Sequence, residues 1–171
     1  MEIELKKVKI YLGMSEETTA FTSDLYIDGI KVGYCKNDGH GGNTYYSSYD
    51  KKGRELIEEC EKYFKTLPKT HCEELNFDFQ PTLDGKIDEI IDEISNKKEK
   101  EKFEKRMKKD MEIGIVVGNV NSYSVYTWKG ITLKDLLLTE RGRNSIKSTI
   151  LTIRSKHQII LNTNIPIELL N

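Results

Sequence analysis

The fold is decided by residues 21–34, which have the sequence FTSDLYIDGIKVGY. Apolar and polar residues alternate from Phe21 to Ile27, as they do in a strand with one buried face. Asp28-Gly29 then favours a tight hairpin turn, in which the backbone needs positive φ angles. Residues 30–34 return as the partner strand. The N-terminal third is therefore expected to be built around an antiparallel hairpin.

A further strand is expected before this hairpin. Residues 3–12 alternate first in one phase and then in the other, and the slip falls at Lys6-Lys7. Because one extra residue moves every later side chain to the opposite face, this pattern predicts a strand with a β-bulge. Residues 13–17 are expected to form a turn. The result is a three-strand meander that leads into a glycine-rich segment.

The remaining elements are expected from periodicity and breaker residues. Residues 56–67 predict an amphipathic helix that stops near Pro68, and residues 68–82 a connecting loop. A second helix should begin near Asp84 and break, or extend into solvent, between Ser95 and Lys102, where its apolar stripe is lost. The rest is expected to be strands over 111–117 and 123–128, a short helix over 132–138, a helix carrying Ile146, Ile150 and Ile153, and a strand over 158–161.

This order predicts an α+β fold, with an antiparallel sheet that comprises the N-terminal meander and later strands and packs against about three helices. A length of 171 residues suits a single domain over 1–171. The net charge of −1 provides no global field for a polyanion, so nucleic acid is not expected as a partner. Three cysteines without a ligand spacing predict free thiols and no metal site. No segment resembles a membrane span or a signal peptide, and we expect a cytoplasmic protein.

The segment after the hairpin is the strongest candidate for a binding site. Three glycines within four positions allow backbone amides to turn toward one point, as in an anion-binding nest. Following tyrosines could stack on a base. The candidate ligand-binding residues here are Asn37, Asp38, Gly39, His40, Gly41, Gly42, Asn43, Tyr45 and Tyr46. The structural alternative is that glycine and asparagine satisfy turn geometry, the tyrosines pack below the loop, and Asp50 caps the next helix.

Other candidate chemistry is weaker. His40 could act as a general acid or base, but no paired acid, metal cluster or nucleophile accompanies it, so no catalytic residue is predicted. Arg141 and Arg143 could neutralise an anion if the fold brings them near the loop. Their alternative role is at a helix C-terminus, with Gly142 as C-cap and Asn144 or Ser145 capping the next helix. The lysine-rich run over 97–109 is interleaved with glutamates and predicts a solvated helical face.

A resemblance supplies a possible context. Its residues are Ala20-Phe21, Leu25, Asp28-Gly29, Lys31-Val32-Gly33, Asn37-Asp38-Gly39 and Gly41-Gly42, together with the ending over 159–164. These motifs resemble those of small, mostly uncharacterised proteins of bacteriophages and prophages that carry an Asn-x-Gly-x-Gly-Gly loop. The resemblance covers about a quarter of the chain and assigns no catalytic residue. It implies a small accessory protein in a bacterial cytoplasm. Such proteins often act against host defence, some by trapping nucleotide-derived signals.

Three functions follow as hypotheses. The first is a binding module that sequesters a small phosphate-bearing nucleotide and leaves it intact, without a cofactor. A pocket built from a flexible loop could be completed by a second subunit, which predicts a homo-oligomer. The second is an inhibitor that binds a host protein, and the third is a metal-independent phosphodiesterase that uses His40. We expect them in that order.

Overall fold

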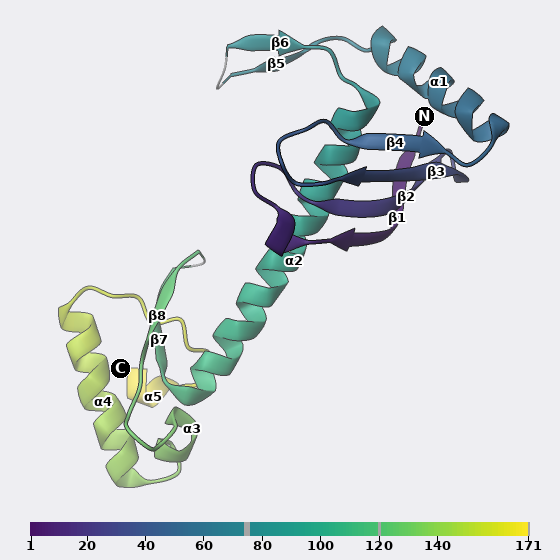
Figure 1. Ribbon diagram of the computed structural model, residues 1–171. Helices are drawn as coiled ribbons and strands as arrows, with labels where there is room; N and C mark the ends of the chain where they lie inside the picture. Colours follow the sequence, from purple (N-terminus) through teal and green to yellow (C-terminus); the bar gives the residue numbers. More distant parts are fainter. Residues whose placement is uncertain (74–75, 120, 171) are drawn as a thin grey trace. The chain divides into compact units, whose positions relative to one another are not determined.

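The computed structural model describes residues 1–73, 76–119 and 121–170, and its elements are shown in Figure 1. The Cα positions divide the chain into two compact units, Met1–Lys98 and Glu99–Asn171. Both contain helices and antiparallel strands, so the predicted α+β class is confirmed. Each unit has its own hydrophobic core, and the two are described separately below. The prediction that residues 1–171 fold as a single domain remains a prediction.

The first unit is built on a four-stranded antiparallel sheet with the order β1-β2-β3-β4. Its strands are β1 (Ile3–Ile10), β2 (Phe21–Ile27), β3 (Ile30–Asn37) and β4 (Tyr45–Ser48). The predicted bulge is confirmed, because the β1–β2 register shifts between Lys6 and Lys9 and Lys7 has a φ of 57°. The predicted hairpin is also confirmed, with φ of 48° at Asp28 and 76° at Gly29. A short 3₁₀ turn, η1 (Leu12–Met14), begins the connection to β2.

Two helices cover one face of this sheet. Helix α1 (Lys51–Thr66) begins where Asp50 Oδ1 accepts a 2.7 Å hydrogen bond from the Gly53 amide, so the predicted Asp50 cap is present. Helix α2 (Leu83–Ile113) contributes apolar side chains from its first turns. The core contains Phe21, Leu25 and Ile27 of β2, Val32 and Cys35 of β3, Ile57, Cys60 and Phe64 of α1, and Leu83, Ile87 and Ile91 of α2. Among the described residues of this unit, no helix covers the opposite face of the sheet (Figure 1).

For the middle of the chain, the predicted loop is wrong, and one of the two alternatives for helix α2 is confirmed. The connection over 68–82 contains a two-stranded hairpin, β5 (Thr70–Cys72) and β6 (Phe77–Phe79), although residues 74–75 lie outside the described residues. Short exposed strands of this kind bury too little to leave a hydrophobic pattern in the sequence. Of the two alternatives for Ser95 to Lys102, the break is wrong and the extension into solvent is confirmed, because helix α2 continues there and residues 96–102 are exposed. Lysine and glutamate are good helix formers, so the helix continues there without an apolar face.

In its described residues, the second unit contains the end of helix α2, a β-hairpin and three further helices. Strands β7 (Ile115–Gly118) and β8 (Tyr123–Tyr126) pair antiparallel, while Val120 lies outside the described residues. Helix α3 (Leu133–Leu136) lies within the short helix predicted over 132–138 and begins with a capping box at Thr132. Helices α4 (Glu140–Ser155) and α5 (Ile167–Leu170) complete the unit.

Three details of this unit differ from the prediction. Met111 and Ile113 end helix α2 instead of starting a strand. Residues 158–161 form only an isolated bridge between Val117 and Ile160, and α5 was not expected. Gly142 lies inside the first turn of α4, which Thr139 caps. A Cβ at Gly142 would lie 2.1 Å from the Leu136 carbonyl oxygen, so close packing explains this glycine and the predicted C-cap does not.

Candidate functional site

The glycine-rich segment is a loop between β3 and β4, and a strand rather than a helix follows it. Asn37, at the end of β3, is buried, and its side chain organises this loop. Its Oδ1 accepts hydrogen bonds from Thr18 Oγ1 at 2.8 Å and from the Gly39 amide at 2.9 Å. Its Nδ2 donates to the Gly42 carbonyl at 2.9 Å and to Thr44 Oγ1 at 3.2 Å. The Asn37 amide group is therefore committed to loop geometry.

Two glycines of the loop form hydrogen bonds with the segment before β2. The Gly39 carbonyl accepts from the amides of Glu16 and Glu17 at 3.0 Å each, and Gly41 donates to Thr18 Oγ1 at 3.3 Å. Gly39 and Gly41 have φ of 90° and 84°, the left-handed region that favours glycine. Two of the amides expected to hold phosphate thus already have acceptors. The structure supports the turn interpretation at these two positions.

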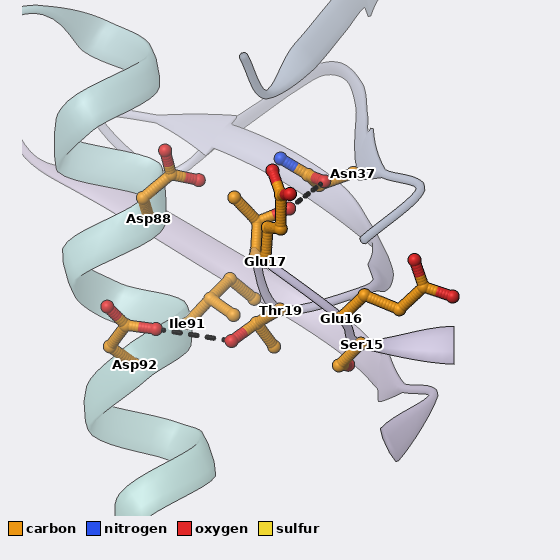
Figure 2. Close-up of a pocket in the computed structure, with 9 residues that line it drawn as sticks. Ser15, Glu16, Glu17, Thr19, Asn37, Asp88, Ile91 and Asp92 are labelled. Atoms are coloured by element: carbon orange, nitrogen blue, oxygen red, sulfur yellow. Dashed lines mark hydrogen bonds between the residues drawn. The ribbon is translucent and has the colours of Figure 1, made fainter. Parts of the chain in front are cut away.

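A cavity of about 440 Å³ lies between this loop region and helix α2. Figure 2 shows Glu16 and Glu17 from the segment before β2, and Asp88 and Asp92 from α2. Burial, followed by the neighbouring carboxylates of α2, raises the pKa of Asp88, whose Oδ1 accepts a hydrogen bond from Thr44. Carboxylates on both sides make this cavity unfavourable for a phosphate group.

The other loop residues are exposed. Asp38 lies 3.3 Å from Lys36 Nζ, and His40 Nδ1 lies 3.2 Å from Glu16 Oε2. Gly42 and Asn43 are exposed, and no described atom lies within 4 Å of a Cβ built on Gly42. His40 is thus a surface partner of a glutamate, at the rim of an acidic cavity.

The two candidate tyrosines lie on opposite faces of the sheet. Tyr46 points to the core side, where its hydroxyl donates to Glu61 Oε1 at 2.6 Å. Tyr45 is 52% exposed on the outer side. Arg141 and Arg143 belong to α4 in the second unit, and Arg143 Nε donates to the Leu137 carbonyl at 2.8 Å. Their predicted part in binding at the loop stays a prediction.

The strand register gathers a different set of residues on the outer face of the sheet. Residues directly opposite each other on paired strands share a face. Lys6 is opposite Asp24, Tyr26 is opposite Lys31, and Lys36 is opposite both Thr22 and Tyr45. We call this surface the tyrosine–lysine face; it comprises Lys6, Lys9, Tyr26, Lys31, Tyr34, Lys36 and Tyr45, with Tyr11 and Tyr49 at its ends.

Three of these rings form a cluster. The Tyr34 centroid lies 6.0 Å from that of Tyr45 and 6.2 Å from that of Tyr49, within the range of aromatic pairs. Their exposed fractions are 37% for Tyr34, 52% for Tyr45 and 54% for Tyr49. Lys31 Nζ lies 4.8 Å from the Tyr49 centroid. The cluster therefore offers solvent-facing π surfaces beside an ammonium group.

Asp24 is the acidic centre of the face. Lys31 Nζ at 3.0 Å and Lys7 Nζ at 3.4 Å pair with its Oδ2, and Tyr49 donates a 3.0 Å hydrogen bond to its Oδ1. The Lys31 ammonium holds the pKa of the Asp24 carboxyl below its ordinary value. Glu4 pairs with Lys6 at 3.3 Å. Lysines outnumber these carboxylates, so the face is locally cationic although the chain is not.

Comparison with protein families, with curated proteins and with solved structures finds no match to this chain. The resemblance to phage proteins therefore stays a prediction. Among the described residues, no helix combines the length and the apolar character needed to cross a membrane. In the same part of the chain, no group of three or more histidine, cysteine, aspartate or glutamate residues is arranged to hold a metal ion.

Sequence reasoning missed most of the tyrosine–lysine face. It named Tyr45, but gave no role to Tyr26, Tyr34 or Lys31. The available signal was the same alternation that defined the strands: every second residue between the buried positions of β2 and β3 must point outward. Only the pairing register shows that these outward residues lie side by side.

Proposed function

We propose that this protein is a binding module that holds a small phosphate-bearing nucleotide without altering it, and that the ligand lies on the tyrosine–lysine face. The observation that carries the proposal is the cluster of Tyr34, Tyr45 and Tyr49 with Lys31 and Lys36 beside it. An aromatic ring binds a base by stacking, whichever base it is. Ammonium groups within the same surface supply the charge that a phosphate needs.

This assignment moves the predicted site away from the glycine loop. The loop amides of Gly39 and Gly41 are occupied, and the cavity beside them is lined by carboxylates. On the outer face, Lys36 pairs with Asp38, but both side chains are largely exposed. Exposed pairs contribute little free energy, so a phosphate can take the place of the Asp38 carboxylate.

The phage context predicted from the resemblance is part of this proposal. A module that stacks a nucleotide on an open face, and whose described residues form no recognised catalytic constellation, suits sequestration of a nucleotide signal. The short motifs within residues 20–42 and 159–164 are the support for that context. The predicted homo-oligomer and the cytoplasmic location belong to the same hypothesis.

The test is a thermal-shift and calorimetric screen of nucleotides, followed by heat release and mass spectrometry of the bound ligand. Tyr34→Ala should weaken binding of any nucleotide that stabilises the protein, and Tyr63→Ala is the matched control. Tyr63 is 39% exposed but lies on α1, away from the sheet's outer face. Equal losses in the two variants, or no nucleotide bound at all, would refute the assignment.

Two more variants separate the competing sites. Gly42→Leu adds bulk at a position with open space, so it should fold and should still bind if the tyrosine–lysine face is the site. Loss of binding in Gly42→Leu would return the site to the glycine loop. His40→Ala should leave the released ligand intact and unchanged in amount. A cleaved product that disappears with His40→Ala would establish the phosphodiesterase hypothesis instead.

A further inference from the structure

The tyrosine–lysine face extends well beyond the space that one nucleotide can cover. The sheet is four strands wide, and adjacent strands are about 4.8 Å apart, so the face spans roughly 14 Å from β1 to β4. A stacked single strand advances about 3.4 Å per nucleotide. The width alone therefore matches about four to five nucleotides.

Aromatic and cationic groups recur across this width. Near β4 there is the cluster around Tyr34. On β2, Lys6 Nζ from β1 lies 4.2 Å from the Tyr26 ring centroid. Beyond the end of β1, the Tyr11 hydroxyl lies 3.3 Å from Thr22 Oγ1, and Tyr11 is 39% exposed. One base stacked at Tyr34 would leave the other two positions unused.

Lysine side chains are spread across the sheet in the same way as the tyrosines. Lys6 and Lys9 lie on β1, while Lys31 and Lys36 lie on β3. An ammonium group thus accompanies the aromatic side chains on both halves of the sheet. Interleaved basic and aromatic side chains on one open surface are the footprint of single-stranded nucleic-acid binding.

We propose that the natural ligand of the tyrosine–lysine face is a single-stranded oligonucleotide or nucleic acid, which crosses the strands with its bases on the tyrosines and its phosphates beside the lysines. This inference rests on the proposed function, because it names the ligand class for the same face. It departs from the expectation drawn from the net charge of −1, since the lysines on this surface outnumber its carboxylates Glu4, Asp24 and Asp38. A duplex is excluded as the preferred ligand, because its base faces are already stacked.

The experiment measures fluorescence anisotropy with fluorescein-labelled oligo(dT) and oligo(U) of 4, 8 and 12 nucleotides, with unlabelled dTMP and UMP measured by calorimetry. Affinity should rise at least about tenfold from the monomer to the oligomers. Tyr34→Ala should weaken oligomer binding by about 5- to 100-fold. With four lysines near phosphates, the slope of log K against log salt should be about −3. Comparison of oligo(dT) with oligo(U) shows whether DNA or RNA is preferred.

A far-side variant distinguishes this inference from the proposed function. Lys9→Ala should weaken oligomer binding and reduce the salt slope by about 0.7, while monomer binding stays unchanged. Lys62→Ala on α1 is the matched control and should change neither. Oligomers that bind no tighter than dTMP, or a 12-base-pair duplex that binds as tightly as the single strand, would overturn this inference alone. Absence of binding to every monomer and oligomer would overturn the proposed function as well.

Discussion

Replacing Gly39 by alanine tests whether the glycine loop has a structural role, which is to hold the segment before β2 in place. Gly39 has a φ of 90°, and a left-handed conformation costs an alanine roughly 1–2 kcal/mol. Its new Cβ would also lie 2.1 Å from the Met14 carbonyl oxygen and 3.0 Å from Ala20 Cβ. Because the contacting oxygen is backbone, relief requires a shift of the segment before β2, and overpacking of this kind costs roughly 1–3 kcal/mol. We therefore expect Gly39→Ala to lower the free energy of unfolding by roughly 2–5 kcal/mol.

Two neighbouring glycines provide graded controls. At Gly41, with a φ of 84°, the Cβ meets only the carboxylate end of Glu17, which can rotate away, so the cost should be about 1–2 kcal/mol. At Gly42 no described atom lies within 4 Å and φ is not in the left-handed region, so alanine should be neutral or stabilise by up to about 1 kcal/mol. Urea unfolding followed by far-ultraviolet circular dichroism measures all three. A Gly39→Ala protein as stable as the parent, or equal losses of unfolding free energy at Gly39 and Gly42, would contradict this structural role of the loop.

Three further predictions concern charge, thiols and the second unit. Asp88→Asn should raise the free energy of unfolding at pH 7, because burial disfavours the carboxylate of Asp88 in the folded protein. This gain should shrink as the pH falls through the raised folded pKa of Asp88 toward 3.8. Paired urea titrations of the parent and the variant from pH 7 to 3.5 measure it. Burial raises the pKa of Cys35 to about 12, so Ellman's reagent should label the half-buried Cys72 in the native protein and reach Cys35 only on unfolding. Asn162→Ala removes the acceptor of the buried Val116 amide and should cost about 1–3 kcal/mol in the second unit, as reported by fluorescence of Trp128, the single tryptophan. If Cys35 becomes reactive at the same urea concentration at which the fluorescence of Trp128 changes, the predicted single domain gains support. Transitions at two different urea concentrations would contradict it.

Local signals predicted much of the first unit. The alternation over Phe21–Ile27 gave β2, the Asp28-Gly29 pair gave the hairpin, and the phase slip at Lys6-Lys7 gave the bulge. Each depends on interactions between residues close in sequence. Strand β4 was missed because its four residues are preceded by a loop that resembles a direct connection to the helix. Because the middle of helix α2 has no apolar stripe, the sequence left open whether the helix breaks or extends into solvent there, and its helix-forming residues favour the continuous helix that is observed.

The candidate site was harder to predict because it depends on pairing between strands. Alternation alone shows that Tyr45 and Tyr46 point to opposite faces, so only one of them could serve an outer site. It also places Tyr34 outward, one position before the buried Cys35. What it cannot give is the register shift between Leu25 and Tyr26, which brings Tyr26 opposite Lys31. The density of glycines made the loop the predicted binding site, although their positive φ angles serve the conformation of the loop itself.

An aromatic cluster on a sheet can serve stability as well as binding, and the two roles make different predictions. Cross-strand pairs stabilise a sheet by about 0.2–1 kcal/mol relative to alanine. A purely structural role for Tyr34 would therefore appear as a small loss of stability and no change in ligand affinity. Stacking on a base would appear in affinity and in its dependence on oligomer length. The exposure of all three rings favours stacking, because a side chain that only braces the sheet need not leave its π face in water.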